Sequence, residues 1–115
     1  MTPEKEKELC SIKIHFGDIF ECLSGDQTTL RVILHLGKGD LFESSLLEKR
    51  NEKLIVNPQA GTTDISKIHR FTGERLTLEQ VIEGLNNYLG KSLGESSPLV
   101  LLLTEKSKKP SRLLK

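Results

Sequence analysis

The sequence predicts an α+β fold in which one main helix packs on one face of a mixed or antiparallel sheet. Three patterns carry this prediction. Apolar and polar residues alternate in the first third of the chain, residues 78–89 place apolar side chains on one helical stripe, and residues 99–103 form an aliphatic run. Since the strand patterns come first and the helix follows, a helix packed on a sheet is favoured over a bundle. A β-grasp-like topology, with the last strand inserted between earlier ones, also fits this order.

Residues 11–23 and 29–36 are expected to form an initial β-hairpin. The apolar residues of the first segment share one parity: Ile12, Ile14, Phe16, Phe20 and Cys22. Those of the second segment also have even numbers: Leu30, Val32, Leu34 and Leu36. A two-residue loop at Gly25 and Asp26 would place apolar residues opposite polar ones, so a loop of odd length, such as three residues, is predicted. Gly17 and Asp18 mark a bulge or bend.

The middle of the chain shows weaker patterns. Residues 41–47 follow neither a helical nor a strand period, and residues 53–56 have the composition of a short strand that ends at Asn57 and Pro58. Residues 57–63 are expected to form a loop, and residues 64–71 a further strand.

The helix at residues 78–89 has the best-defined ends. Its local signals are a capping box at Thr77 and Gln80, a hydrophobic staple at Leu76 and Val81, and a left-handed C-cap at Gly90. Gly84 lies inside the helix at a cost of about 1 kcal/mol relative to Ala, which indicates that another element packs closely against it. After this helix, residues 99–103 lack polar alternation and are predicted to form a C-terminal strand buried on both faces.

Charge divides the chain into three parts. Residues 104–115 hold five basic residues and one acidic residue, so they carry +4, and the rest of the chain carries −3 of the total +1. We therefore expect a charged, flexible N-terminus at residues 1–9, one domain at residues 10–103 and a basic, disordered tail at residues 104–115. The cationic candidates for contact with a partner or a nucleic acid are Lys67, Arg70, Arg75, Lys106, Lys108, Lys109, Arg112 and Lys115.

No catalytic motif occurs in the structural context that it needs. Residues 90–94 match G-x-S-x-G, but they follow a helix, whereas a nucleophile elbow lies between a strand and a helix. His15 and His35 face each other across the predicted hairpin and are the metal-ligand candidates. No Cys-x-x-Cys or His-x-x-x-His spacing accompanies them, so a solvated sheet face is favoured. We predict no catalytic residue, no cofactor and no metal.

The function that these patterns favour is a small, non-enzymatic interaction or regulatory module. It would bind a protein partner through a sheet edge or through a groove beside the helix. One alternative is a nucleic-acid accessory protein that uses the basic tail and the cluster at residues 67–75, and another is a small enzyme whose site assembles in space. Self-association through an unpaired strand stays open. The acid-rich start, the two cysteines and the absence of a long apolar segment predict a cytoplasmic protein without membrane contact, with the nucleus as the alternative.

Overall fold

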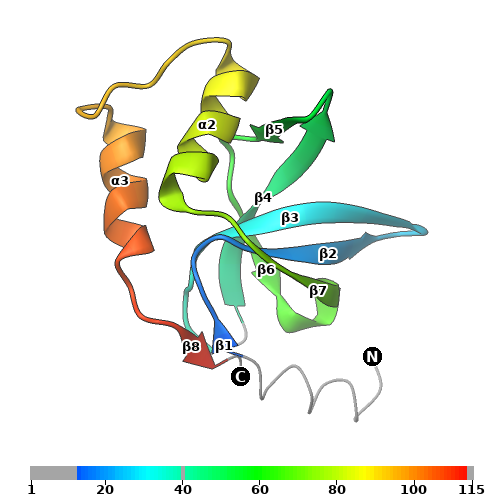
Figure 1. Cartoon of the computed structure of the whole chain (residues 1–115). Coiled ribbons are helices and arrows are strands. Elements are labelled where there is room, and N and C mark those ends of the chain that lie inside the picture. Colours follow the sequence, from blue (N-terminus) through cyan, green and yellow to red (C-terminus); the bar gives the residue numbers. More distant parts are fainter. Residues whose placement is uncertain (1–12, 40, 114–115) are drawn as a thin grey trace.

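The computed structural model describes residues 13–39 and 41–113, and it confirms the α+β class (Figure 1). Its main sheet is antiparallel and has the strand order β5-β4-β3-β2-β7, with β6 pairing to β4. The strands of this sheet are β2 (Asp18–Ser24), β3 (Gln27–His35), β4 (Leu41–Arg50), β5 (Lys53–Val56), β6 (Gly61–Asp64) and β7 (Ile68–Arg75). The remaining elements are β1 (Lys13–Ile14), the short 3-10 helix η1 (Ile65–Lys67), α2 (Leu78–Leu89), α3 (Pro98–Ser107) and β8 (Arg112–Leu113).

The sheet buries apolar side chains on both of its faces. On one face it packs against α2 and α3 through a core formed by Phe16, Ile19, Val32, Leu34, Leu47, Val56, Leu76, Val81, Leu85 and Leu103. On the other face the sheet curls around a second core, formed by Ile14, Phe20, Ile33, Leu36, Phe42 and Ile68. We call these the helix-side core and the concave core.

The β2–β3 hairpin corrects the predicted register. Ser24 pairs with Gln27 across a loop of two residues, so the predicted loop of odd length is wrong. Apolar residues of equal parity must pair only where a single sheet face is buried, and this sheet is buried on both faces. Ile19 and Phe20 are adjacent in β2 and both are buried, Ile19 in the helix-side core and Phe20 in the concave core. Residues of either parity can therefore be apolar here.

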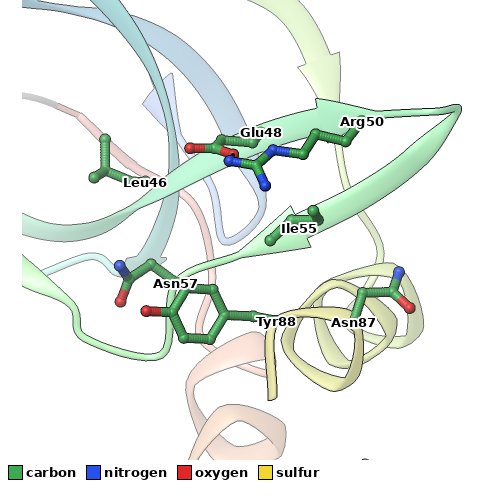
Figure 2. A pocket seen from close by; sticks show the side chains of 7 residues that line it. All are labelled: Leu46, Glu48, Arg50, Ile55, Asn57, Asn87 and Tyr88. Atoms are coloured by element: carbon green, nitrogen blue, oxygen red, sulfur yellow. Dashed lines mark ion pairs between the residues drawn. The ribbon is translucent and has the colours of Figure 1, made fainter. Parts of the chain in front are cut away.

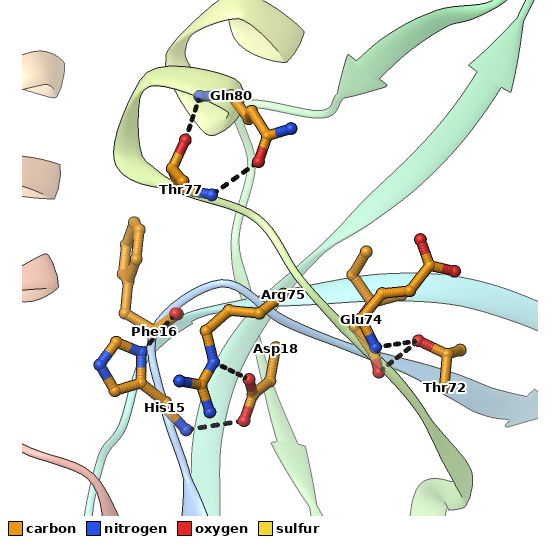
Figure 3. A network of polar contacts seen from close by, with 9 residues as sticks. His15, Phe16, Asp18, Thr72, Glu74, Arg75, Thr77 and Gln80 are labelled. Atoms are coloured by element: carbon orange, nitrogen blue, oxygen red, sulfur yellow. Dashed lines mark hydrogen bonds and ion pairs between the residues drawn. The ribbon is translucent and has the colours of Figure 1, made fainter.

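The predicted bend at Gly17 and Asp18 is present and separates β1 from β2. Gly17 has φ 91°, and a Cβ at this position would lie 2.1 Å from the main-chain oxygen of Leu76. Asp18 closes the bend, because its carboxylate accepts the main-chain N–H of His15 at 2.9 Å and the Nε–H of Arg75 at 2.6 Å (Figure 3). This corner ties the start of β2 to the segment that leads into α2.

The middle of the chain is more regular than predicted. Residues 41–47 belong to β4, which continues to Arg50, and the predicted strand at residues 53–56 is confirmed as β5. The expected loop at residues 57–63 includes the first residues of β6. The expected strand at residues 64–71 is divided between η1 and β7.

Helix α2 confirms the predicted bounds and both predicted ends. The Thr77 hydroxyl accepts the N–H of Gln80 at 3.2 Å, and the Gln80 side chain accepts the N–H of Thr77 at 2.9 Å (Figure 3). Gly90 has φ 69° and is the left-handed C-cap. The close neighbour expected at Gly84 is Val56 of β5, whose Cγ2 would lie 2.5 Å from a Cβ at position 84.

The aliphatic run at residues 99–103 is helical, so the predicted buried C-terminal strand is wrong. Pro98 begins α3, a position where its missing N–H costs no hydrogen bond. Val100 and Leu103 are buried, Leu103 in the helix-side core, whereas Leu101 and Leu102 are exposed. Five consecutive aliphatic residues carry no period that distinguishes a strand from a helix. No late strand enters the middle of the sheet, and the β-grasp-like arrangement is not observed.

The segment at residues 104–113 also differs from the disordered tail that the sequence predicts. Residues 104–107 complete α3, and β8 pairs with β1. The guanidinium of Arg112 donates at 2.7 Å to three main-chain oxygens around the β3–β4 connection, those of Leu36, Gly39 and Leu41. The predicted flexible segment at residues 1–9 and the last two residues of the tail lie outside the described residues.

Candidate functional site: a cleft between two hairpins

Strands β3 and β4 pair along only part of their length. Their paired region joins Arg31 to Leu46 and ends there, and His35 pairs with Glu43 at its other end. Beyond this region, residues 27–30 pair only with β2, and residues 47–50 pair only with β5. The β2–β3 and β4–β5 hairpins therefore diverge as two arms (Figure 1). Between them lies a cleft of about 550 Å³, lined by Thr29, Leu30 and residues 46–50.

The two hairpin turns determine which backbone groups face this cleft. Each arm turns through two residues, and in the β4–β5 turn Asn51 and Glu52 have φ 49° and 67°, as a type I′ turn requires. In such hairpins the residues that flank the turn bond to each other, and the next residue along each strand directs its N–H and C=O outward. This alternation points the backbone groups of Thr28, Leu30, Leu47 and Lys49 into the cleft, where the described residues provide no pairing strand.

Leu46 is the apolar centre of this surface. Its side chain is 40% exposed although it lies in the middle of the sheet. It lines three neighbouring hollows: the cleft, a groove beside α2, and a hollow on the concave face of the sheet next to the cleft. No local sequence pattern indicates the exposure of Leu46, because it results from the divergence of β3 and β4.

The groove beside α2 continues the surface from Leu46. Leu46 and Ile55 lie on the two strands of the β4–β5 arm and Tyr88 lies on α2 (Figure 2). These residues line a space of about 280 Å³, and Tyr88 is 51% exposed. Glu48 and Arg50 form an ion pair of 2.9 Å between their side chains at its rim. The groove thus has apolar walls and a charged rim, as surfaces that bind peptides often have.

The edges of β5 and β7 are protected. Helix α2 lies along β5, and Asn87 Nδ2 donates to the main-chain oxygen of Leu54 at 2.8 Å. Edge strand β7 carries Gly73 at φ 86° and charged side chains, which are features that discourage strand pairing. Compared with the edges of β5 and β7, the cleft is therefore better suited to accept another strand.

Four of the eight basic residues that the sequence singles out lie close to acidic partners. Arg70 pairs with Glu21 at 2.9 Å, and Arg75 pairs with Asp18 at 2.6 Å. The helical lysines of the tail also have partners: Lys106 lies 3.5 Å from Glu43, and Lys108 lies 3.6 Å from Glu105. Lys109 is exposed, Arg112 binds main-chain oxygens, Lys67 lies at the end of η1, and Lys115 is outside the described residues.

The two candidate metal ligands have separate surroundings. His15 Nδ1 lies 2.7 Å from the main-chain oxygen of Phe16, beside the Asp18 bend (Figure 3). His35 Nε2 lies 4.0 Å from the carboxylate of Glu43. Within residues 13–39 and 41–113, no group of three or more His, Cys, Asp and Glu residues is placed to hold a metal ion.

Comparisons with known proteins give no relative: no family model, curated protein or solved structure matches the chain. In the described part of the chain, neither helix has the length and apolar character needed to cross a bilayer.

Proposed function

We propose that this protein is a non-enzymatic interaction module that binds an extended segment of a partner protein in the cleft between the two hairpin arms. The observation that carries the proposal is the end of β3–β4 pairing at Arg31 and Leu46, which leaves two inner strand edges open to a third strand. Strand addition at such an edge is a common mode of peptide recognition, in which main-chain hydrogen bonds supply affinity and side-chain contacts supply specificity.

The cleft offers a peptide both kinds of contact. On one side of the cleft, a peptide can bond to the outward N–H and C=O groups of Thr28 and Leu30. On the opposite side it can bond to those of Leu47 and Lys49. Leu46 provides an exposed apolar contact between them, since its side chain lines the cleft. Burial of such a side chain by a partner favours association by about 25 cal/mol for each Å² of apolar surface removed from water.

Charge distribution favours a protein partner over a nucleic acid. Four of the predicted cationic candidates, Arg70, Arg75, Lys106 and Lys108, lie in ion pairs with acidic residues. Binding of a phosphate backbone depends on cations that replace counterions, and a paired cation replaces fewer of them. The predicted basic residues therefore contribute less to nucleic-acid binding than their number indicates.

A peptide selection tests the proposal. Linear peptides selected from a phage-displayed library against the wild-type protein are expected to bind Thr28→Ala with unchanged affinity and Thr28→Pro at least about fivefold more weakly. Proline removes the N–H that faces the cleft, and the loss of one main-chain hydrogen bond corresponds to about 1 kcal/mol or more. Thr28 is exposed, so neither change disturbs a core.

Thr28→Ala is the matched control, because it removes the same side chain and keeps the N–H that proline removes. Circular dichroism of each variant reports whether the hairpin is retained. Equal affinity of the selected peptides for Thr28→Ala and Thr28→Pro, or a failure to select any peptide, would contradict the proposal.

A further inference from the structure

The curled sheet is open at the end nearest the cleft. There the concave face contains a hollow of about 540 Å³, bounded by the β2–β3 hairpin, β4, β6 and η1. Such a volume is in the range of ligand-binding cavities, which run from about 300 to 1,000 Å³. Arg31 and Lys67 are the charged residues that line this hollow, and no acidic residue of the described part does so.

Arg31 is held in place by buried polar groups. Its Nε–H donates to the Ser44 hydroxyl at 2.7 Å, and one Nη donates to the main-chain oxygen of Ser44 at 2.7 Å. Ser44 is fully buried, and its hydroxyl lies 2.8 Å from that of Thr63. The guanidinium is therefore pre-organised, and the other Nη has no hydrogen-bond partner among the described residues.

Neither cation of the hollow has a carboxylate partner among the described residues. This distinguishes them from Arg70 and Arg75, which form ion pairs on the outside of the sheet. Glu21, the acidic residue of the neighbouring strand, points to the opposite face and binds Arg70. A guanidinium and an ammonium without a local anion form a site for an anionic group.

The hollow and the cleft are continuous, because Thr29 and Leu46 line both. Side chains of a bound strand alternate between the two sheet faces. Every second side chain of a strand in the cleft would therefore face the hollow, toward Arg31, and the intervening ones would face Leu30 and Leu47 at the margin of the helix-side core.

We infer that the hollow is an acid-binding subsite, which takes the carboxylate of a Glu or Asp side chain from the extended peptide bound in the cleft. This inference rests on the proposed function and gives the partner segment a chemistry: acidic residues alternate with aliphatic ones. Arg31 receives the carboxylate, Lys67 adds a second cation from η1, and the aliphatic side chains cover Leu30, which is only partly buried.

Two capped peptides of equal length, a Val–Glu repeat and a Val–Gln repeat, test the subsite. The wild-type protein is expected to bind the Val–Glu repeat about tenfold more tightly, since charge-assisted hydrogen bonds are roughly twice as strong as neutral ones. Lys67→Gln should reduce this preference at least threefold. Lys38→Gln is the matched control, because it removes an exposed lysine from the β3–β4 turn, outside the hollow and the cleft.

The subsite and the cleft can fail separately in this experiment. Equal affinity for the two repeats would overturn the subsite and leave the cleft proposal intact, whereas a failure of both repeats to bind would overturn both. Inorganic phosphate tests the hollow without a peptide, and it is expected to shift the amide resonances of Thr62 and Thr63. Absence of any shift would overturn the subsite whatever the peptides do. Lys67 carries the test because Arg31 also satisfies buried Ser44, and its loss would affect folding.

Discussion

Gly84 shows how a single side-chain-free position connects a helix to a strand. Alanine would favour the helix by about 1 kcal/mol, yet a Cβ at position 84 would lie 2.5 Å from Cγ2 and 3.2 Å from the main-chain nitrogen of Val56. The close approach of α2 to β5 therefore requires a glycine. The sequence indicated that some element packs on Gly84, but the identity of that element depends on long-range pairing and could not be predicted.

Gly84→Ala is expected to lower the free energy of unfolding by about 1–2 kcal/mol. Overpacking of a core costs about 1–3 kcal/mol, which exceeds the gain in helix propensity. Urea denaturation followed by circular dichroism measures the change. Gly94→Ala is the control, because no atom lies within 4 Å of a Cβ at this position, and it should change stability by no more than about 0.5 kcal/mol. A Gly84→Ala variant as stable as the wild type would show that α2 moves away from β5 at little cost.

At the scale of elements, the sequence predicts those features of helices and strands that depend on contacts between residues close together in the chain. The ends of α2 follow from contacts within three or four residues, and these contacts form as predicted: the Thr77 and Gln80 side chains bond to main-chain N–H groups, and the backbone N–H of Gly90 donates to the main-chain oxygen of Asn86. The β2–β3 register could not be obtained from parity, because Ile19 and Phe20 are buried on opposite faces. The helical state of residues 99–103 depends on the surface that Val100 and Leu103 cover, which the sequence does not display.

The last element, β8, depends on Arg112. This side chain fastens β8 to the β3–β4 connection, and its removal would leave several main-chain oxygens without a charged donor. We expect Arg112→Ala to lower the free energy of unfolding by about 2–3 kcal/mol, since hydrogen bonds to charged groups contribute about 1.5–3 kcal/mol each and this site is partly exposed. Thermal denaturation at several urea concentrations provides the measurement.

Lys109→Ala separates this anchoring role from the general effect of a basic residue. Lys109 is exposed and belongs to the same segment, and its loss should change stability by no more than about 0.5 kcal/mol. If both variants were equally stable, Arg112 would be dispensable and β8 would be a passive extension of the chain.

At the scale of the whole molecule, the charge asymmetry of the sequence has a structural explanation. The acidic body and the basic C-terminal segment meet, because Lys106 pairs with Glu43 and Arg112 binds the turn after β3. The arrangement of the whole sheet also explains why the sequence does not indicate the candidate site. Its open edges and its exposed Leu46 result from the point at which β3 and β4 separate, and that point is a property of the complete sheet.

The two cores are expected to unfold as one unit, because they share the backbone of the same strands. Ile19 and Phe20 are neighbours in β2, and Val32 and Ile33 are neighbours in β3, with one member of each pair in each core. Loss of either core would remove the partner surface that fixes these strands. A single cooperative transition is therefore expected, as for most small domains.

Leu85→Ala in the helix-side core and Ile33→Ala in the concave core test this expectation. Each should lower the free energy of unfolding by about 2–5 kcal/mol. Tyr88 is the single tyrosine of a chain without tryptophan, so its fluorescence reports on α2, whereas far-ultraviolet circular dichroism reports on the sheet as well. In both variants the two signals should change at the same urea concentration. An Ile33→Ala variant that loses its circular dichroism signal before its Tyr88 signal would instead show that the concave core, with the acid-binding hollow above it, opens while α2 stays packed. Strand addition in the cleft would then be coupled to folding of the half of the molecule that receives the peptide.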